Sequence, residues 1–193
     1  MNLPNKLTVV RICLVPLFVF FVLAEGIPHR LIYGLLIFAA ASYTDHLDGK
    51  IARERGLITN FGKLMDPLAD KILVMSALIC FVKLNWASAV CVIIIMFREF
   101  AVTSIRLVAV EQGEVIAANQ WGKAKTISQM AAVLGILGFQ IAAALGWQVP
   151  APIGAGMTLA SLLGEILIYI ATALTLISGI IYAKDGAHLF RDR

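Results

Sequence analysis

Long apolar runs, separated by short polar stretches, constrain this chain more than any other feature of its sequence. A helix needs about 20 apolar residues to cross a bilayer, and the period-2 alternation of a membrane β-barrel is absent. The apolar runs cover residues 7–24, 31–53, 69–85, 87–109, 126–146 and 158–182. The sequence therefore predicts an all-α integral membrane protein: one domain over residues 1–193, built as a bundle of six transmembrane helices.

Composition supports this class. Hydrophobic residues make up 60% of the chain and charged residues 15%, against roughly 25% charged residues in a soluble domain. The net charge of +4 therefore informs membrane topology, and we expect no nucleic-acid partner. Cys13, Cys80 and Cys91 lie inside apolar runs at spacings that suit neither a zinc site nor a disulfide framework, so we expect them to be packing residues.

Basic residues are distributed unequally between the two ends of the predicted helices. If the loops that follow the first, third and fifth runs share one side, that side carries only Arg30 and Lys83. The opposite side receives Lys6, Lys50, Arg53, Arg55, Lys63, Lys123, Lys125, Lys184, Arg191 and Arg193. The positive-inside rule places this side, with both termini, in the cytoplasm. We expect a multi-pass protein of the cell membrane.

Four carboxylates lie where the second apolar run ends and the third begins. Asp45 and Asp48 are three residues apart and Asp66 and Asp70 are four apart, so each pair shares a helical face. Any one of these aspartates could have a purely structural role. Asp66, for example, precedes Pro67 as an N-cap would. Together they would repel one another unless cations hold them. Oxygen ligands without Cys or His favour Mg²⁺ or Mn²⁺, and two such ions would suit phosphoryl transfer.

These aspartates belong to a longer pattern, D-x2-D-G-x2-A-R-x8-G-x3-D-x3-D, in which every gap length is matched. Its fixed residues are Asp45, Asp48, Gly49, Ala52, Arg53, Gly62, Asp66 and Asp70. The pattern resembles the signature of the CDP-alcohol phosphotransferase family. This resemblance implies a six-span membrane enzyme that uses two divalent cations to displace CMP from a CDP-activated lipid or alcohol.

The resemblance also implies a role for each residue of the pattern. The metal ligands would be Asp45, Asp48 and Asp66. Asp70 would both approach the metals and act as the general base. The CDP site would be lined by Asp48, Gly49, Ala52, Arg53 and Gly62. Small residues there leave room for a bulky ligand, and an arginine can meet a phosphate.

Charges near the fourth and fifth apolar runs are candidates for binding the acceptor alcohol. These residues are Arg98, Arg106, Lys123 and Lys125. Together they could form a basic pocket for an acceptor that carries a phosphate, because charge-assisted contacts to phosphate are strong when partly buried. The sequence also allows a structural Glu99–Arg106 ion pair, and lysines that only anchor a helix end at the cytoplasmic side.

Segments outside the aspartate pattern sharpen the resemblance. REF, SIR, GKAKT and the opening NLPNKLTVVR resemble segments of the bacterial phosphatidylglycerophosphate synthases within the same family. This implies CDP-diacylglycerol as the donor and glycerol 3-phosphate as the acceptor. Asn5, Thr8 and Arg11 recur in that group, and we expect them near the nucleotide or the phosphates. Helix capping and a snorkelling arginine would explain the same residues.

Alternative functions would require other sequence features. Serine, an inositol phosphate or phosphatidylglycerol could replace the acceptor, although a basic pocket argues against serine. Intramembrane prenyltransferases also pair aspartates with Mg²⁺, but with other spacings and more spans. A divalent-cation transporter would need a polar path to the far side, whereas the 146–156 loop carries no charge. Membrane lipid is an expected partner, and small faces such as Gly135 with Gly138 would suit a homodimer or intramolecular packing.

Overall fold

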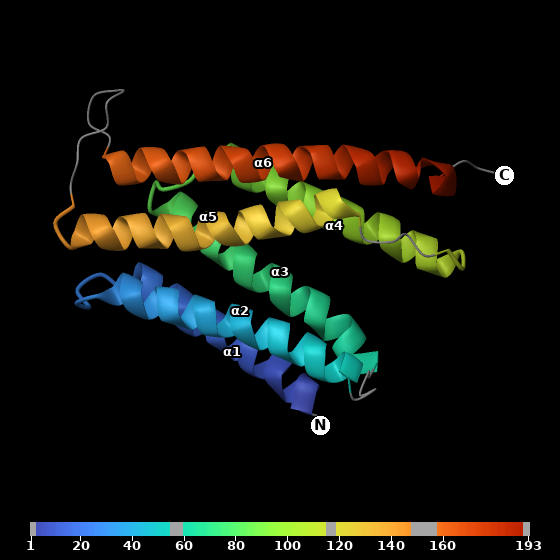
Figure 1. The fold of residues 1–193 in the computed structure, drawn as a ribbon, viewed down its shortest axis with the longest axis horizontal. Coiled ribbons are helices and arrows are strands. Elements are labelled where there is room, and N and C mark those ends of the chain that lie inside the picture. The colour runs from blue at the N-terminus through green and yellow to red at the C-terminus, as the bar shows by residue number, and fades with distance from the viewer. Residues whose placement is uncertain (1–2, 55–59, 115–118, 148–157, 191–193) are drawn as a thin grey trace.

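The secondary structure of the described residues is helical (Figure 1). The computed structural model describes the backbone of residues 3–54, 60–114, 119–147 and 158–190. Within these ranges, the side chains left out of the description are those of residues 3–4, 45–54, 60–64, 66–67, 70 and 190. The elements are α1 (Leu3–Leu23), α2 (Arg30–Glu54), α3 (Asn60–Lys83), α4 (Ala89–Glu111), α5 (Gln120–Ala144), α6 (Leu159–Asp185) and the 3-10 helix η1 (Ala187–Phe190).

The predicted all-α fold is confirmed, and each apolar run falls on one of these helices. Three segments are long and apolar enough to cross a membrane: Asn5–Leu23, Gln120–Ala144 and Leu159–Asp185. Three helices begin several residues earlier than the apolar runs predict: α1 starts at Leu3, α3 at Asn60 and α5 at Gln120. Hydropathy reports where a helix can contact lipid, whereas backbone hydrogen bonds continue through the polar turns that precede the apolar run.

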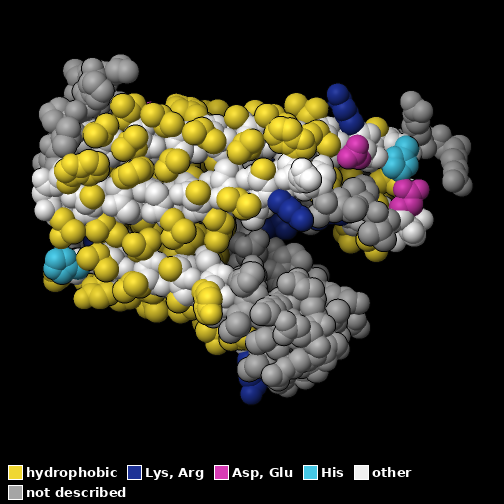
Figure 2. Space-filling model, in the orientation of Figure 1, with side chains coloured by type: hydrophobic (Ala, Val, Ile, Leu, Met, Phe, Trp, Pro, Cys, Tyr) yellow, Lys and Arg dark blue, Asp and Glu magenta, His cyan; other side chains and the backbone are white. Residues whose placement is uncertain are grey.

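Successive helices run back and forth, so the connections alternate between two ends of the molecule (Figure 1). Both termini lie at the end where α2 leads into α3 and α4 into α5. α1 packs against α2 and α3, whereas α6 packs against α4 and α5. Figure 2 shows hydrophobic side chains along the flanks of the helices, and most of the charged side chains of this face gather near the end with the termini.

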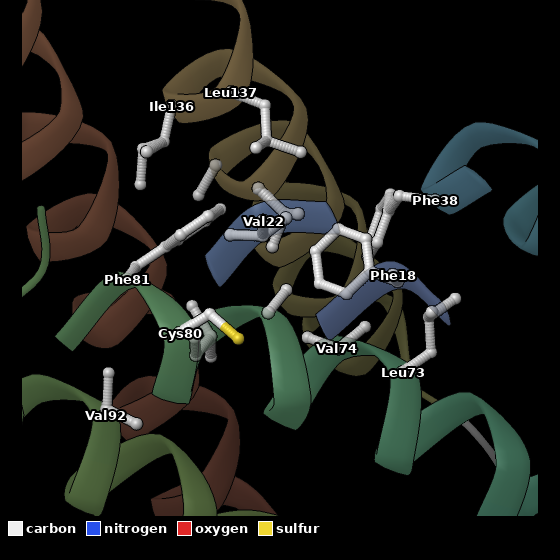
Figure 3. Packing of buried hydrophobic residues seen from close by; sticks show 14 of the residues in the cluster. Phe18, Val22, Phe38, Leu73, Val74, Cys80, Phe81, Val92, Ile136 and Leu137 are labelled. Atoms are coloured by element: carbon white, nitrogen blue, oxygen red, sulfur yellow. The ribbon is translucent and has the colours of Figure 1, made fainter. Parts of the chain in front are cut away.

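An apolar core lies where the six α-helices meet, and Figure 3 shows part of it. Phe18 of α1 packs against Phe38 of α2 with ring centroids 5.6 Å apart, and α3 inserts Phe81 beside Cys80. Cys80 and Cys91 are buried and Cys13 is exposed. Lipid tails are as apolar as these side chains, so close van der Waals packing stabilises the core more than exclusion of water does.

Glycines allow two helix pairs to approach closely. A Cβ on Gly34 of α2 would lie 2.8 Å from Cγ2 of Val22, and one on Gly135 of α5 would lie 2.6 Å from Cδ1 of Leu167. Gly135 therefore serves packing within the chain, between α5 and α6. A Cβ on Gly138 would meet no neighbouring described atom within 4 Å.

The C-terminal segment is fastened to the end of α4. His188 and Glu114 lie 2.7 Å apart between Nε2 and Oε2, and Gln112 Nε2 donates to the carbonyl of Leu189 at 3.2 Å. The hydrogen bond to Glu114 raises the pKa of His188 above 6.5. These contacts hold the last turns of the chain beside the connection between α4 and α5.

Candidate active site

The backbone brings the two aspartate pairs to one end of the bundle. Asp45 and Asp48 lie in the C-terminal half of α2, and Asp66 and Asp70 lie in the N-terminal half of α3. Because α3 begins at Asn60, Asp66 lies inside this helix, and the N-cap position expected from the sequence is wrong. These two helices contact each other, and their joined ends lie together in Figure 1. The side chains that carry the predicted metal and CDP contacts lie outside the described residues: Asp45, Asp48, Gly49, Ala52, Arg53, Gly62, Asp66 and Asp70. The backbone thus places both pairs at the same end of the bundle, and their role as a shared metal site stays a prediction.

The described side chains include no group of three or more His, Cys, Asp or Glu that could hold a metal ion. The aspartates between 45 and 70 therefore remain the candidate ligands. Helix ends that lie side by side can present carboxylates three or four residues apart to a common point. Such a set supplies only oxygen ligands, which Mg²⁺ and Mn²⁺ prefer.

A buried polar face of α1 lies against α2 close to the first aspartate pair. Asn5, Thr8 and Arg11 are spaced three apart and are 7%, 0% and 0% exposed. Arg11 Nε donates to the carbonyl of Ala41 at 3.3 Å. Ala41 is one helical turn before Asp45, so the α1 face points toward the end of α2 that carries the motif. This position is compatible with the predicted role near the nucleotide or its phosphates, which stays a prediction.

A second polar group joins α4, α5 and α6, and we call it the basic cluster. Its members are Arg98, Glu99, Arg106, Lys125, Ser178 and Tyr182. Arg98, Glu99 and Lys125 are 8%, 7% and 5% exposed. Glu99 Oε1 accepts from Arg98 Nη1 at 3.2 Å and pairs with Lys125 Nζ. Buried charges persist when they are paired and hydrogen-bonded, so Glu99 fixes both cations.

Tyr182 holds the arginines of the basic cluster in place. Its hydroxyl oxygen accepts from Arg106 Nη2 at 2.7 Å and from the backbone N–H of Asn119 at 3.1 Å. Its ring faces both guanidinium groups, whose Cζ atoms lie 5.5 Å (Arg98) and 5.0 Å (Arg106) from the ring centroid. These distances fit cation–π attraction. A Cβ on Gly122 would lie 3.1 Å from the hydroxyl, so a glycine there lets α5 approach this tyrosine.

Two nitrogens of the basic cluster make no hydrogen bond to the described residues. The Nε atoms of Arg98 and Arg106 are buried and have no hydrogen-bond partner among the described residues. Arg98 Nη2 already donates to Ser178 Oγ at 2.6 Å, which orients its guanidinium group. Among the described residues the cluster holds three cations and one carboxylate, so it favours an anionic ligand.

The basic cluster lies next to the middle of α3. Lys71, which follows Asp70 directly, lines a small cavity together with Glu99, Lys125 and Gln129. Figure 2 shows the surface hollowed at this end of the molecule, with Lys or Arg side chains at the edge of the hollow. The two groups that the sequence singled out separately are therefore neighbours in the fold.

The structure groups most, but not all, of the residues predicted to bind the acceptor. Arg98, Arg106 and Lys125 meet in the basic cluster, whereas Lys123 is exposed on α5. The alternative Glu99–Arg106 ion pair is wrong, because Glu99 pairs with Lys125 and Arg98 and the arginine side chain turns to Tyr182. Residues seven positions apart are separated by about 10 Å along a helix. Glu99 and Arg106 therefore interact with closer side chains, most of them on other helices.

Sequence reasoning missed the contribution of α6. Thr172, Thr175, Ser178 and Tyr182 are buried and recur every three or four residues along an apolar helix. That spacing marks a single polar face, and Thr175 Oγ1 accepts from Gln129 of α5 at 3.2 Å. The pattern was available in the sequence, although its partners on α4 and α5 were not.

Glu99→Gln tests whether the carboxylate holds the basic cluster together. The substitution leaves two buried cations without their shared counter-charge, and we expect it to lower the free energy of unfolding by about 3–5 kcal/mol. Lys123→Gln, which removes an exposed charge from α5, should change it by less than about 0.5 kcal/mol. Unfolding of the purified protein in mixed detergent micelles measures both. Equal stability of the two variants would contradict the assigned pairing.

Comparison with known proteins agrees with the motif. The family model of the CDP-alcohol phosphatidyltransferases matches residues 1–181. A Bacillus subtilis protein named CDP-diacylglycerol–glycerol-3-phosphate 3-phosphatidyltransferase is 49% identical over 147 residues, which cover 70% of this chain and 76% of the relative. A Rickettsia felis protein of the same name is 35% identical over 185 residues, which cover 95% of this chain and 94% of the relative.

Proposed function

Because the chain belongs to the CDP-alcohol phosphatidyltransferase family, as its aspartate pattern predicted, we propose that it transfers the phosphatidyl group of CDP-diacylglycerol to glycerol 3-phosphate. The products are phosphatidylglycerophosphate and CMP. The observation that carries this proposal is the similarity to relatives named for this reaction, one of them matched over 95% of the chain. The positively charged basic cluster supports an acceptor that carries a phosphate.

The proposed enzyme is one domain of six membrane-spanning helices in the cell membrane. Its termini and its active site face the cytoplasm. The predicted cytoplasmic loops carry most of the basic residues, which supports this orientation. The termini lie at the end of the bundle that carries the aspartates (Figure 1), which supports it too. Glycerol 3-phosphate is soluble and would arrive from the cytoplasm, whereas the lipid donor would enter laterally from the bilayer.

The aspartates form the donor half of the proposed site. Asp45, Asp48, Asp66 and Asp70 would hold two Mg²⁺ or Mn²⁺ ions. When bound, these ions supply positive charge that neutralises the diphosphate and makes CMP a tolerable leaving group. Arg53 would contact a phosphate of CDP. The nucleotide would lie over Gly49, Ala52 and Gly62, with Asn5 and Thr8 at its edge.

The basic cluster forms the acceptor half. The Nε donors of Arg98 and Arg106 would bind the phosphate of glycerol 3-phosphate, and the charge of Lys125 would add to the attraction. Lys123, exposed on α5, would act earlier by attracting the anion to the site. Glu99 and Tyr182 would not touch the acceptor but would fix the cations that do.

The reaction joins the two halves. Asp70 takes the proton of the 1-hydroxyl of glycerol 3-phosphate. The oxygen of this hydroxyl attacks the β-phosphorus of CDP-diacylglycerol, and the bond between that phosphorus and the CMP oxygen breaks. Lys71 supports this placement, because it follows Asp70 and lines one cavity with Glu99 and Lys125. A hydroxyl carried by a phosphate bound in the basic cluster would thus be held beside the general base.

The acceptor is tested by assaying CMP release from CDP-diacylglycerol by the purified protein. We expect release that depends on glycerol 3-phosphate and on Mg²⁺ or Mn²⁺, because the cluster offers its charges to a phosphate. Serine, inositol phosphate and phosphatidylglycerol, supplied in turn, should give no turnover. Turnover with one of these three but not with glycerol 3-phosphate would overturn the proposed acceptor.

Tyr182→Phe tests the acceptor half by itself. Losing the hydroxyl frees Arg106, and a hydrogen bond to a charged group contributes about 1.5–3 kcal/mol, so the KM for glycerol 3-phosphate should rise roughly tenfold or more. The KM for CDP-diacylglycerol should stay within about twofold. Tyr169→Phe, on the exposed face of α6, is the matched control and should change neither. Equal rises in both KM values would argue against this assignment.

A further inference from the structure

A second cavity lies at the end of the bundle opposite the proposed active site. It has a volume of about 690 Å³, within the range of ligand pockets. Its walls come from the start of α2, the end of α5 and the beginning of α6. Leu31 in this cavity is 14 residues before Asp45 on the same helix, which is roughly 20 Å at the helical rise. The cavity is therefore separate from both halves of the proposed site.

The lining of this cavity is amphipathic. Apolar walls are provided by Ile27, Leu31 and Ile141, and polar groups by Gln140 and Ser161. The cavity lies where the apolar segments of α1, α5 and α6 end, which is the depth of lipid headgroups in a bilayer. An occupant that matches it has an apolar chain and a polar head.

The charged residues of the lining indicate which polar headgroup the cavity would bind. Arg30 and His29 line the cavity, and one Nη of Arg30 donates to the carbonyl of Val22 at the end of α1. That bond holds the guanidinium group in place and uses one of its five N–H donors. No Asp or Glu is among the described residues that line the cavity. A phosphate on the remaining arginine donors would satisfy this lining.

We propose that this cavity binds an anionic phospholipid from the leaflet opposite the active site. Its headgroup phosphate would lie on Arg30, and an acyl chain would lie along Ile27, Leu31 and Ile141. The proposal does not depend on the reaction assigned to the other end. An enzyme that spans the bilayer would in this way sense the anionic lipid of the far leaflet.

Trp86 lines the same cavity and reports on its occupant. The double variant Trp121→Phe/Trp147→Phe leaves Trp86 as the sole tryptophan of the three. This variant is reconstituted in two kinds of phosphatidylcholine bilayer. One contains brominated phosphatidylglycerol and the other the same fraction of brominated phosphatidylcholine, and in both lipids the bromine is on the acyl chain near the headgroup. We expect the anionic lipid to quench Trp86 with an apparent affinity roughly fivefold higher, the preference one arginine confers near a membrane surface.

Two further substitutions separate specific binding from general attraction of anionic lipid. Arg30→Gln should abolish the preference, whereas Lys83→Gln removes the other basic charge of the same end, outside the cavity, and should keep it. Ser161→Phe narrows the cavity and should reduce quenching by both brominated lipids. Equal quenching by the two lipids in the parent double variant would overturn the proposal. So would a preference that Lys83→Gln loses and Arg30→Gln retains.

Discussion

A charge buried among apolar helices needs a partner, and the contacts that meet this need organise the end of the bundle where the proposed chemistry lies. A lone charge at the centre of a membrane helix costs about 2.5–3.5 kcal/mol. Glu99 pairs with both Arg98 and Lys125 and so ties α4 to α5, while Tyr182 ties α6 to both. Elsewhere in the bundle, packing around residues such as Phe18 and Phe81 holds the helices together. Polar contacts thus fix the orientation of the very helices that carry the proposed acceptor site.

Helix direction brings the rest of the proposed site together. Because the helices alternate in direction, the end of α2 and the start of α3 lie at the same end as the connection between α4 and α5 (Figure 1). The helix ends that carry the aspartates therefore lie at the same end as the basic cluster although they are separate in sequence, and Lys71, which follows Asp70, lines a cavity with Glu99 and Lys125. One group would hold a diphosphate and the other a phosphate monoester. Only where both are present can a hydroxyl on one ligand reach the phosphorus of the other.

The sequence predicted those features that depend on local patterns. The helices follow from apolar runs, and the family follows from the spacing of Asp45, Asp48, Asp66 and Asp70. The early starts of α1, α3 and α5 were missed, because hydropathy does not register a helix that continues through polar turns. The partners of Glu99 and the role of Tyr182 were also missed, because they depend on which faces of α4, α5 and α6 meet. Apart from the neighbouring pair Arg98–Glu99, those contacts join residues 26 to 84 positions apart, and no periodicity within one helix encodes them.

In the proposed mechanism the aspartate pattern performs the chemistry, and the rate of CMP release by Asp70→Asn is the decisive measurement. The rate is measured with saturating CDP-diacylglycerol and glycerol 3-phosphate, alongside a binding measurement for the CDP-lipid. Loss of the general base predicts a fall in kcat of about 10²- to 10⁴-fold, with glycerol 3-phosphate still bound by the basic cluster. CMP release at the parent rate would contradict the mechanism and would favour a protein whose acidic residues carry ions across the membrane.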